Sequence, residues 1–271
     1  MLDIHHNMSL ENKIIWITGA SSGIGKALAL ELSKLNCKLI LSARNKDRLL
    51  AVKNECTDPN NVHIVPFDLE NYESCPKIVT STISLFGKID ILINNGGVSQ
   101  RDSAINTKIA VDKRIMDINY FGTIALSKAL LPHFIKQQAG HFVVVTSVVG
   151  KVATPVRSSY SASKHALHGF FDSLRAEVYK DHIDVTLILP GYVRTELSFN
   201  ALVGDGSRQD KMDVATDNGI LPAVFVKKMI TAIRKKKREI VIGGLKETAS
   251  VYLKRIWPGL LAKLVRKVHV T

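Results

Sequence analysis

The chain has 271 residues, of which 46% are hydrophobic and 23% are charged. This composition supplies a large core and excludes an intrinsically disordered protein. The formal net charge is +13, but residues 227–271 hold 13 Lys/Arg against two acidic residues, so the first 226 residues are nearly neutral. Because the excess of basic residues is confined to the carboxyl end, nucleic acid is disfavoured as a partner. This holds even though the carboxyl end contains the basic run Arg234–Arg238.

No apolar run approaches the ~20 residues that a membrane span requires. The amino terminus has neither the basic start nor the apolar run of a signal peptide. Cys37, Cys56 and Cys75 lack metal-ligand spacing and are expected to be free thiols in a reducing compartment. The sequence therefore favours a soluble, cytoplasmic protein with no metal site.

Short β-branched runs alternate with longer helical patterns along most of the chain. Strands are expected at residues 14–17, 39–41, 62–65, 89–93, 141–145 and 183–188. Apolar strands separated by helices predict a parallel sheet that is buried on both faces. The predicted fold class is α/β, a single-domain Rossmann-type doubly wound parallel sheet with flanking helices. After Pro222 we expect a helix to about Lys237 and a short strand at residues 239–242.

A glycine-rich turn lies between the first strand and the first helix, in Thr18-Gly19-Ala20-Ser21-Ser22-Gly23-Ile24-Gly25. Glycines at these positions allow a tight turn, close approach of a phosphate and close helix–strand packing. The amino end of the helix then faces the phosphate with free N–H groups. A dinucleotide site is the functional interpretation, and a merely structural turn is the alternative.

The second strand ends at Ser42-Ala43-Arg44-Asn45, with no acidic residue before Asp47. An acid here would bind the ribose 2′-hydroxyl of NAD, whereas an arginine suits the 2′-phosphate of NADP. Arg44 therefore favours NADP(H) over NAD(H), with an ordinary surface arginine as the alternative.

Tyr160 and Lys164 are four residues apart, so on a helix they share one face. A nearby ammonium favours the phenolate and lowers the pKa of a tyrosine. A tyrosine that exchanges its proton near neutral pH suits carbonyl/alcohol interconversion. Taken alone, the pair is weak evidence, because the same spacing more often belongs to a solvated, inert helix face.

Residues 10–245 resemble the short-chain dehydrogenase/reductase family, because they contain several motifs in the order typical of that family. These are the glycine turn, Asn94-Asn95-Gly96-Gly97, Asn119, Ser147, Tyr160/Lys164 and Pro190-Gly191. The resemblance implies that Tyr160 is the proton donor and that Ser147 stabilises charge on the substrate oxygen. It also implies that Lys164 keeps Tyr160 acidic and binds the nicotinamide ribose, and that Asn119 positions a water. Gly96 stands where the family has alanine, which loosens that loop.

The same resemblance assigns the cofactor contacts. These are Gly19, Ser21, Ser22, Gly23, Ile24, Gly25, Arg44, Asp68, Leu69, Asn95, Gly96, Tyr160, Lys164, Pro190, Gly191, Val193 and Thr195. The expected function is NADP(H)-dependent interconversion of a carbonyl and a secondary alcohol on a lipophilic substrate, by a homodimer or homotetramer. The alternatives are a catalytically silent NADP(H)-binding sensor and a peripheral membrane-associated protein of this fold. Residues 196–221 are expected to form a lid over the substrate pocket, and His165 and His168 to be packing or surface groups.

Residues 1–245 are assigned to the enzyme domain and residues 246–271 to a basic amphipathic extension. In the extension, Ala249, Tyr252, Leu253 and Ile256 share one helical face. A second helix starting at Pro258 would set Leu260, Leu261, Leu264, Val265 and Val268 opposite Lys263, Arg266 and Lys267. Such helices either cover a subunit interface or the pocket, or lie on a membrane surface. The carboxyl-terminal part also resembles one branch of the family and, more distantly, its NADP(H)-dependent hydroxysteroid dehydrogenases.

Overall fold

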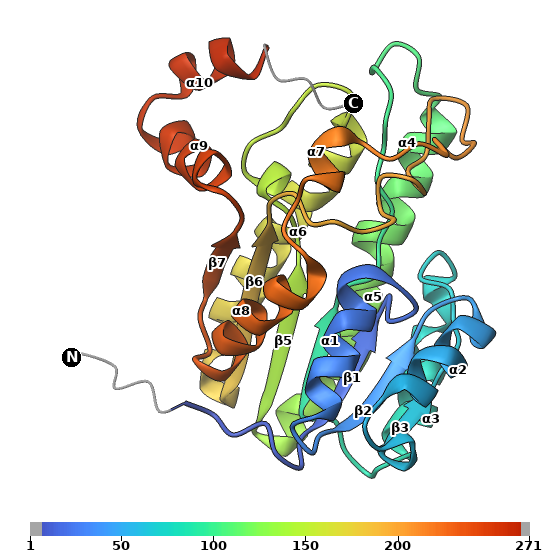
Figure 1. Ribbon diagram of the computed structural model, residues 1–271. Helices are drawn as coiled ribbons and strands as arrows, with labels where there is room; N and C mark the ends of the chain where they lie inside the picture. Colours follow the sequence, from blue (N-terminus) through green and yellow to red (C-terminus); the bar gives the residue numbers. More distant parts are fainter. Residues whose placement is uncertain (1–6, 267–271) are drawn as a thin grey trace.

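The computed structural model describes residues 7–266. Seven strands in this part of the chain form one parallel sheet in the order β3-β2-β1-β4-β5-β6-β7 (Figure 1). The strands are β1 (Ile14–Thr18), β2 (Lys38–Ser42), β3 (Val62–Ile64), β4 (Ile91–Asn94), β5 (Gly140–Val145), β6 (Ile183–Pro190) and β7 (Glu239–Ile242). The strand order reverses between β1 and β4, and ligands of open α/β sheets bind at the carboxyl ends of strands at such a point. The predicted Rossmann-type sheet is confirmed.

Helices cover both faces of the sheet (Figure 1). One face carries α1 (Gly23–Ser33), α2 (Lys46–Glu55) and α8 (Pro222–Arg234), and the other carries α3 (Cys75–Ile83), α5 (Gly122–Gln137) and α6 (Ser158–Glu177). A π-helical turn, η3 (Asp117–Phe121), joins α4 (Ile109–Met116) to α5. Short 3₁₀ turns are η1 (Pro59–Asn61), η2 (Tyr72–Ser74), η4 (Val148–Gly150) and η5 (Tyr179–Asp181). The remaining helices are α7 (Val214–Asp217), α9 (Leu245–Ile256) and α10 (Pro258–Val265).

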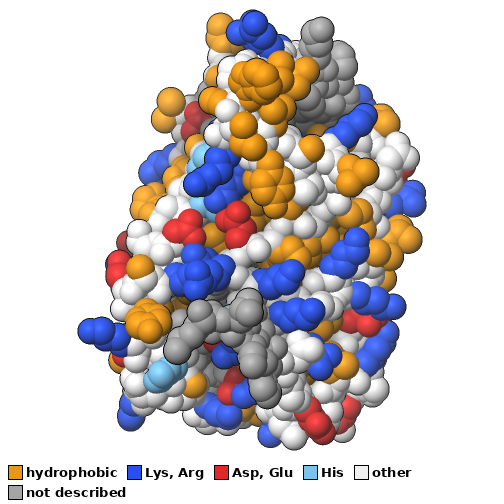
Figure 2. All heavy atoms as spheres, turned by 90° about the vertical axis from the view of Figure 1, so that its left-hand side faces the viewer, with side chains coloured by type: hydrophobic (Ala, Val, Ile, Leu, Met, Phe, Trp, Pro, Cys, Tyr) orange, Lys and Arg blue, Asp and Glu red, His pale blue; other side chains and the backbone are white. Residues whose placement is uncertain are grey.

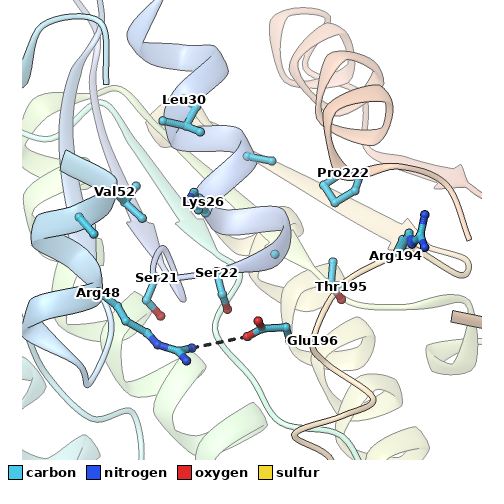
Figure 3. Close-up of a pocket in the computed structure, with 13 residues that line it drawn as sticks. Ser21, Ser22, Lys26, Leu30, Arg48, Val52, Arg194, Thr195, Glu196 and Pro222 are labelled. Carbon is cyan, nitrogen blue, oxygen red and sulfur yellow. Dashed lines mark hydrogen bonds and ion pairs between the residues drawn. The ribbon is translucent and has the colours of Figure 1, made fainter. Parts of the chain in front are cut away.

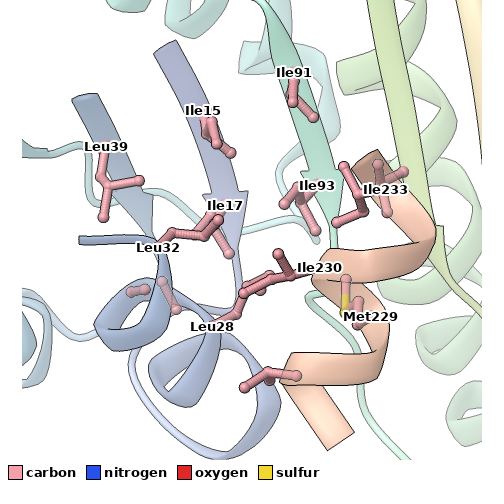
Figure 4. Close-up of a cluster of buried hydrophobic side chains, with 14 of the residues drawn as sticks. Ile15, Ile17, Leu28, Leu32, Leu39, Ile91, Ile93, Met229, Ile230 and Ile233 are labelled. Carbon is pink, nitrogen blue, oxygen red and sulfur yellow. The ribbon is translucent and has the colours of Figure 1, made fainter. Parts of the chain in front are cut away.

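The side chains of β1 divide the core into two layers. Ile15 and Ile17 pack with α1 and α8 on one face (Figure 4). Trp16 points to the other face, into the cluster that α5 and α6 complete, and its indole N–H donates to Ser42 Oγ at 2.8 Å. Burying each such side chain contributes about 1.5–3 kcal/mol, so the two layers hold the sheet rigid beneath the site.

Helix α8 ends three residues earlier than predicted. After Arg234, Lys236 adopts a left-handed conformation (φ 48°), and the N–H of Lys237 bonds to the carbonyl of Ala232 at 3.1 Å. These bonds close the helix in the manner of a Schellman-type cap, and the basic run lies where the helix dipole favours positive charge.

The carboxyl-terminal helices differ from the rest because they bury little. Among the described residues, α9 has no fully buried side chain, and α10 buries Leu261 alone. Lys267 and Val268, which belong to the predicted amphipathic pattern, lie outside the described residues. Within residues 7–266, no helix combines the length and the apolar character needed to cross a membrane.

Candidate active site

The glycine turn after β1 is locked to the loop after β4. Gly19 is left-handed (φ 64°), and a Cβ on it would lie 2.7 Å from the Cα of Gly96. The Asn95 amide donates to the carbonyls of Thr18 and Gly19 at 3.0 and 3.2 Å, and Thr18 Oγ1 accepts from the N–H groups of Asn95 and Gly96. These contacts leave room for glycine only at position 19 and aim the amino end of α1 into open space.

That space is a groove of about 520 Å³ (Figure 3). Ser21, Ser22 and Gly23 form one wall, α2 contributes Arg48, and the segment after β6 contributes Thr195. The Arg48 guanidinium reaches across the groove to Glu196, with Nη1 3.5 Å from Oε2. Serine hydroxyls, cations and a helix amino end suit a diphosphate, so the residues present fit a dinucleotide.

Arg44 is not part of the groove lining. It extends from the end of β2, is more than half exposed, and lies with Nη1 3.9 Å from Asp68 Oδ2. Asp68 also accepts from the N–H of Glu70 at 3.0 Å. Arg48, which the sequence did not single out, lines the groove from the side of α2.

Ser147 and Tyr160 meet at the carboxyl ends of β5 and β6. Ser147 follows β5, and its hydroxyl donates to the carbonyl of Pro190 at 3.5 Å and accepts from the N–H of Val149 at 3.2 Å. Tyr160 lies in the first turn of α6 and is buried. Burial raises the pKa of Tyr160, whereas the charges of Arg157 and Arg101 and the Ser147 hydroxyl act to lower it.

Lys164 is buried beside Tyr160 and is held by a backbone carbonyl group. Its Nζ donates to the carbonyl of Val145 at 2.9 Å and lies 5.8 Å from the ring centroid of Tyr160. Burial lowers the pKa of Lys164 to about 8. The charges that oppose the effect of burial on the phenol come from Arg157 and Arg101, and a role of Lys164 in keeping Tyr160 acidic stays a prediction.

Asn119 lies in the π-helical turn and is fully buried. Its Oδ1 accepts from the N–H of Val98 at 2.8 Å, and its Nδ2 donates to the Val98 carbonyl at 2.9 Å and to Ser163 Oγ at 3.0 Å. A Cβ on Gly97 would lie 2.9 Å from Asn119 Oδ1 and 3.7 Å from Lys164 Nζ. Gly97 therefore leaves room for both side chains, and all four predicted catalytic residues come together at one edge of the sheet.

The segment after β6 crosses the groove. A Cβ on Gly191 would lie 2.9 Å from the Cα of Gly243, and a Cβ on Gly23 would lie 3.2 Å from Thr195. Val193 forms an isolated bridge with Ile220. Of the predicted residues, Thr195 thus lies beside the glycine turn and Pro190 beside Ser147, with Gly191 and Val193 in the segment between them. The other predicted contacts, Ile24 and Leu69, lie at the start of α1 and against Gly96.

This arrangement matches a known family. The family model described as short chain dehydrogenase matches residues 13–202. The chain belongs to the short-chain dehydrogenase/reductase family. It is therefore an oxidoreductase of a family that binds nicotinamide cofactors.

Its relatives support the predicted branch. The dehydrogenase/reductase SDR family protein 7-like of Anopheles gambiae is 44% identical over 264 residues, which cover 95% of this chain and 83% of that protein. The dehydrogenase/reductase SDR family member 7B of Xenopus laevis is 41% identical over 263 residues, or 94% of this chain and 81% of that protein. The predicted resemblance to the 7B branch is confirmed.

Solved structures share the fold at low identity. A short chain dehydrogenase/reductase from Burkholderia phymatum in complex with NAD superposes with a TM-score of 0.82 at 22% identity, over 93% of this chain and 96% of that chain. A short-chain dehydrogenase from Streptomyces avermitilis gives a TM-score of 0.81 at 23% identity, over 97% and 100%.

Several residues of this short-chain dehydrogenase/reductase escaped the sequence motifs. The Gln100 side chain accepts from the N–H groups of Ser159 and Tyr160 at the start of α6. Arg101, Arg157 and Asp213 form a buried ionic cluster near Tyr160. No periodic pattern in the sequence could have indicated these residues, because Gln100, Arg157 and Asp213 lie outside the helices and strands.

Proposed function

We propose that this oxidoreductase binds NADP(H) and interconverts a carbonyl group and a secondary alcohol on a lipophilic small molecule. The observation that carries the proposal is the convergence of Ser147, Tyr160, Lys164 and Asn119 beside the glycine turn. A proton donor, an oxyanion donor and a dinucleotide cradle are the parts that such a reaction requires.

The residues of the glycine turn and the segment 190–195 would hold the cofactor, which supplies or accepts a hydride when bound. In the reductive direction, Tyr160 gives its phenolic proton to the substrate oxygen as negative charge grows there. The Ser147 hydroxyl turns from the Pro190 carbonyl and donates to the same oxygen. Lys164 is held beside Tyr160 by Val145 and would bind the nicotinamide ribose, and Asn119 would position the water that links Lys164 to solvent.

A preference for NADP(H) is supported by two arginines, Arg44 at the end of β2 and Arg48 in the lining of the groove. Arg44 follows β2 where an NAD-specific site has an acid, and Arg48 lines the groove from α2. Both guanidinium groups are more than half exposed, and their ion-pair contacts are long at 3.9 and 3.5 Å, so a phosphate would displace little.

Cofactor choice is tested by measuring KM for NADPH and NADH with wild type, Arg44→Ala, Arg48→Ala and the matched surface control Lys46→Ala. We expect wild type to prefer NADPH, and the two arginine variants to raise KM for NADPH at least tenfold while leaving KM for NADH and the Lys46→Ala variant unchanged. A wild-type preference for NADH would contradict the assignment.

Catalysis is tested with a panel of lipophilic ketones and aldehydes, following NADPH by absorbance. Tyr160→Phe is expected to bind NADPH with unchanged Kd and to lose turnover by about 10²–10⁴-fold, since it keeps the ring and lacks the proton. Unchanged kcat in Tyr160→Phe would reject the mechanism. NADPH binding without turnover of any panel member would favour the silent sensor.

Association with a membrane surface is a second proposal, and it rests on α9 and α10. Tyr252 is 63% exposed, Ile256 78% and Trp257 65%. Figure 2 shows the face of the molecule that lies on the left-hand side in Figure 1. Hydrophobic side chains are gathered toward its upper end, with Lys and Arg side chains among and below them. A second copy of this basic surface would bring like charges together, whereas anionic lipid headgroups complement it.

Cosedimentation with phosphatidylcholine vesicles, with and without 30% phosphatidylglycerol, tests this proposal. We expect wild type to bind the anionic vesicles and the double variant Ile256→Ser/Trp257→Ser to lose at least tenfold in affinity. Ile105→Ser is the matched control, because Ile105 is 92% exposed on another part of the surface. Equal binding by all three proteins would reject the proposal.

A further inference from the structure

Two arginines and one aspartate meet in a buried cluster near Tyr160. Arg101, Arg157 and Asp213 are all more than nine-tenths buried. Arg101 follows β4, Arg157 immediately precedes α6, and Asp213 belongs to the predicted lid segment 196–221. The cluster therefore holds two cations against one anion in a place where an unbalanced charge is costly.

Arg101 is fully engaged in the fold. Its Nε and Nη2 donate to Asp213 Oδ2 at 2.7 and 2.6 Å, and its Nη1 donates to Ser99 Oγ at 2.6 Å and to the Gln100 carbonyl. The second oxygen of Asp213 accepts from the Gln209 amide at 3.0 Å. Arg101 and Asp213 thus form a complete structural pair that ties the lid segment to the loop after β4.

The guanidinium of Arg157, in contrast to that of Arg101, makes few hydrogen bonds. Among the described residues, its guanidinium has one acceptor, Asp213 Oδ2, at 3.4 Å from Nη2, and that oxygen is already shared with Arg101. The buried Nε has no hydrogen-bond partner in this part of the chain. A guanidinium has five N–H donors, so the described residues satisfy a minority of the donors of Arg157.

Arg157 also lies among the parts of the active site. It is one helical turn before Tyr160, and its charge acts on the phenol. Its Cζ lies 5.5 Å from the ring centroid of Tyr192, within the segment 190–195. A group bound to Arg157 would therefore lie between the proton donor, the proposed nicotinamide-binding segment and the lid segment.

We propose that Arg157 binds an anionic group of the substrate, so that the enzyme acts on carbonyl compounds or alcohols that also carry a carboxylate or a phosphate. The planar fork of an arginine binds both groups through paired hydrogen bonds, and a substrate anion brings the charge that the cluster lacks. The inference rests on the proposed oxidoreductase function and refines its substrate class, from lipophilic to amphipathic and anionic.

Matched substrate pairs test this specificity. One arm compares oxo-carboxylates with their methyl esters, and the other compares phosphorylated hydroxyketones with the free hydroxyketones, each with NADPH. We expect wild type to show at least tenfold higher kcat/KM for the anionic member in one arm, and that arm identifies the group. Equal kcat/KM for both members in both arms would overturn the proposal.

Variants at position 157 assign the effect to this side chain. Arg157→Met is expected to lower kcat/KM for the anionic substrate at least tenfold more than for its neutral partner, with this extra loss in KM, because the effect of the Arg157 charge on Tyr160 is common to both substrates. Arg157→Lys keeps the positive charge but lacks the planar pair of donors. Its kcat/KM for the anionic substrate should therefore lie between the values of wild type and Arg157→Met. Arg114→Met, which removes a partly exposed arginine paired with Glu70, is the control and should match wild type. An equal loss on anionic and neutral substrates in Arg157→Met would assign Arg157 to the fold instead.

A binding measurement separates this proposal from the catalytic one. With NADPH present, octanoate or monooctyl phosphate should raise the Tm of wild type, 1-octanol should not, and neither anion should raise the Tm of Arg157→Met. This pattern without turnover of any carbonyl compound would support the anion site and reject the catalytic function. Turnover of neutral ketones with no effect of the anions on Tm would support the catalytic function and reject the anion site.

Discussion

The side-chain oxygen of Gln100 accepts a hydrogen bond from the backbone N–H of Tyr160 at 3.4 Å and a shorter one, at 2.8 Å, from that of Ser159. Arg157, which precedes α6, makes no side-chain cap, so a residue from the loop after β4 caps the helix that carries Tyr160, the proposed proton donor. Gln100 is itself fully buried and donates to Thr107 Oγ1 at 2.9 Å. The loop after β4 thereby fixes the position of Tyr160.

Replacing this cap is expected to damage stability and activity together. Gln100→Leu leaves two buried N–H groups without an acceptor, which costs about 2 kcal/mol of the free energy of unfolding. We also expect kcat to fall at least tenfold as Tyr160 loses its position. Gln100→Glu keeps the accepting oxygen and should retain more activity than Gln100→Leu. Urea unfolding and steady-state kinetics measure both effects, and wild-type kcat in Gln100→Leu would show that the cap does not position the tyrosine.

The buried ammonium of Lys164 should make stability depend on pH. Its pKa falls from 10.5 when unfolded to about 8 when folded, so the unfolded chain binds more protons between these values. The free energy of unfolding should therefore gain about 3 kcal/mol from this group as pH rises from 8 to 10.5. The gain is measured as the difference in the free energy of unfolding between wild type and Lys164→Met at each pH. The contributions of the other titrating groups cancel in this difference. A constant difference across this range would mean that Lys164 is not desolvated.

Gly96 and Leu69 should behave as a coupled pair. A Cβ on Gly96 would lie 2.6 Å from Leu69 Cδ1, so leucine occupies the space that the alanine of the family motif would need. Gly96→Ala alone is expected to destabilise by about 1 kcal/mol, because the leucine must move. In the double variant Gly96→Ala/Leu69→Val the alanine should become neutral or stabilising. Urea unfolding of both singles and the double gives the coupling energy, and strictly additive effects would contradict the contact.

The buried ionic cluster should respond unequally to the loss of its members. Asp213→Asn leaves Arg101 and Arg157 without an anion and should destabilise the protein by about 3–5 kcal/mol. Arg157→Met leaves the Arg101–Asp213 pair intact and should keep or raise the Tm. Thermal unfolding of the two variants side by side measures this asymmetry. Equal losses would mean that Arg157 and Arg101 contribute alike to the fold.

The fold could be predicted largely from local patterns. Continuous apolar runs such as Ile14–Ile17 require burial on both sides, and that requirement implies a parallel sheet between helix layers. The motif residues could also be predicted, since Tyr160 and Lys164 have a fixed spacing within α6 and Ser147 follows the apolar run of β5. What the spacing of Tyr160 and Lys164 omitted was burial, which raises the pKa of one and lowers that of the other.

The contacts that the sequence did not predict join distant segments. Arg157 and Asp213 are 56 residues apart, and Gln100 and Tyr160 are 60 residues apart. Neither pair leaves a periodic signal, because each depends on how two loops pack above the sheet. The exposure of Tyr252 and Ile256 likewise depends on where α9 lies, which its amphipathic pattern does not determine.

The π-helical turn at Asp117–Phe121 lies between α4 and α5 without a break in the helix. Its hydrogen bonds run from i to i+5, so it holds one residue more than an α turn, and removing one residue would restore a continuous α-helix with α4 still in phase with α5. Val111 and Ile115 would then keep facing Leu202 of the lid segment. Asn119, in contrast, would lose its alignment with Val98 and Ser163. The extra residue of this turn thus serves the position of the asparagine, so a single-residue deletion here should lower activity more than stability.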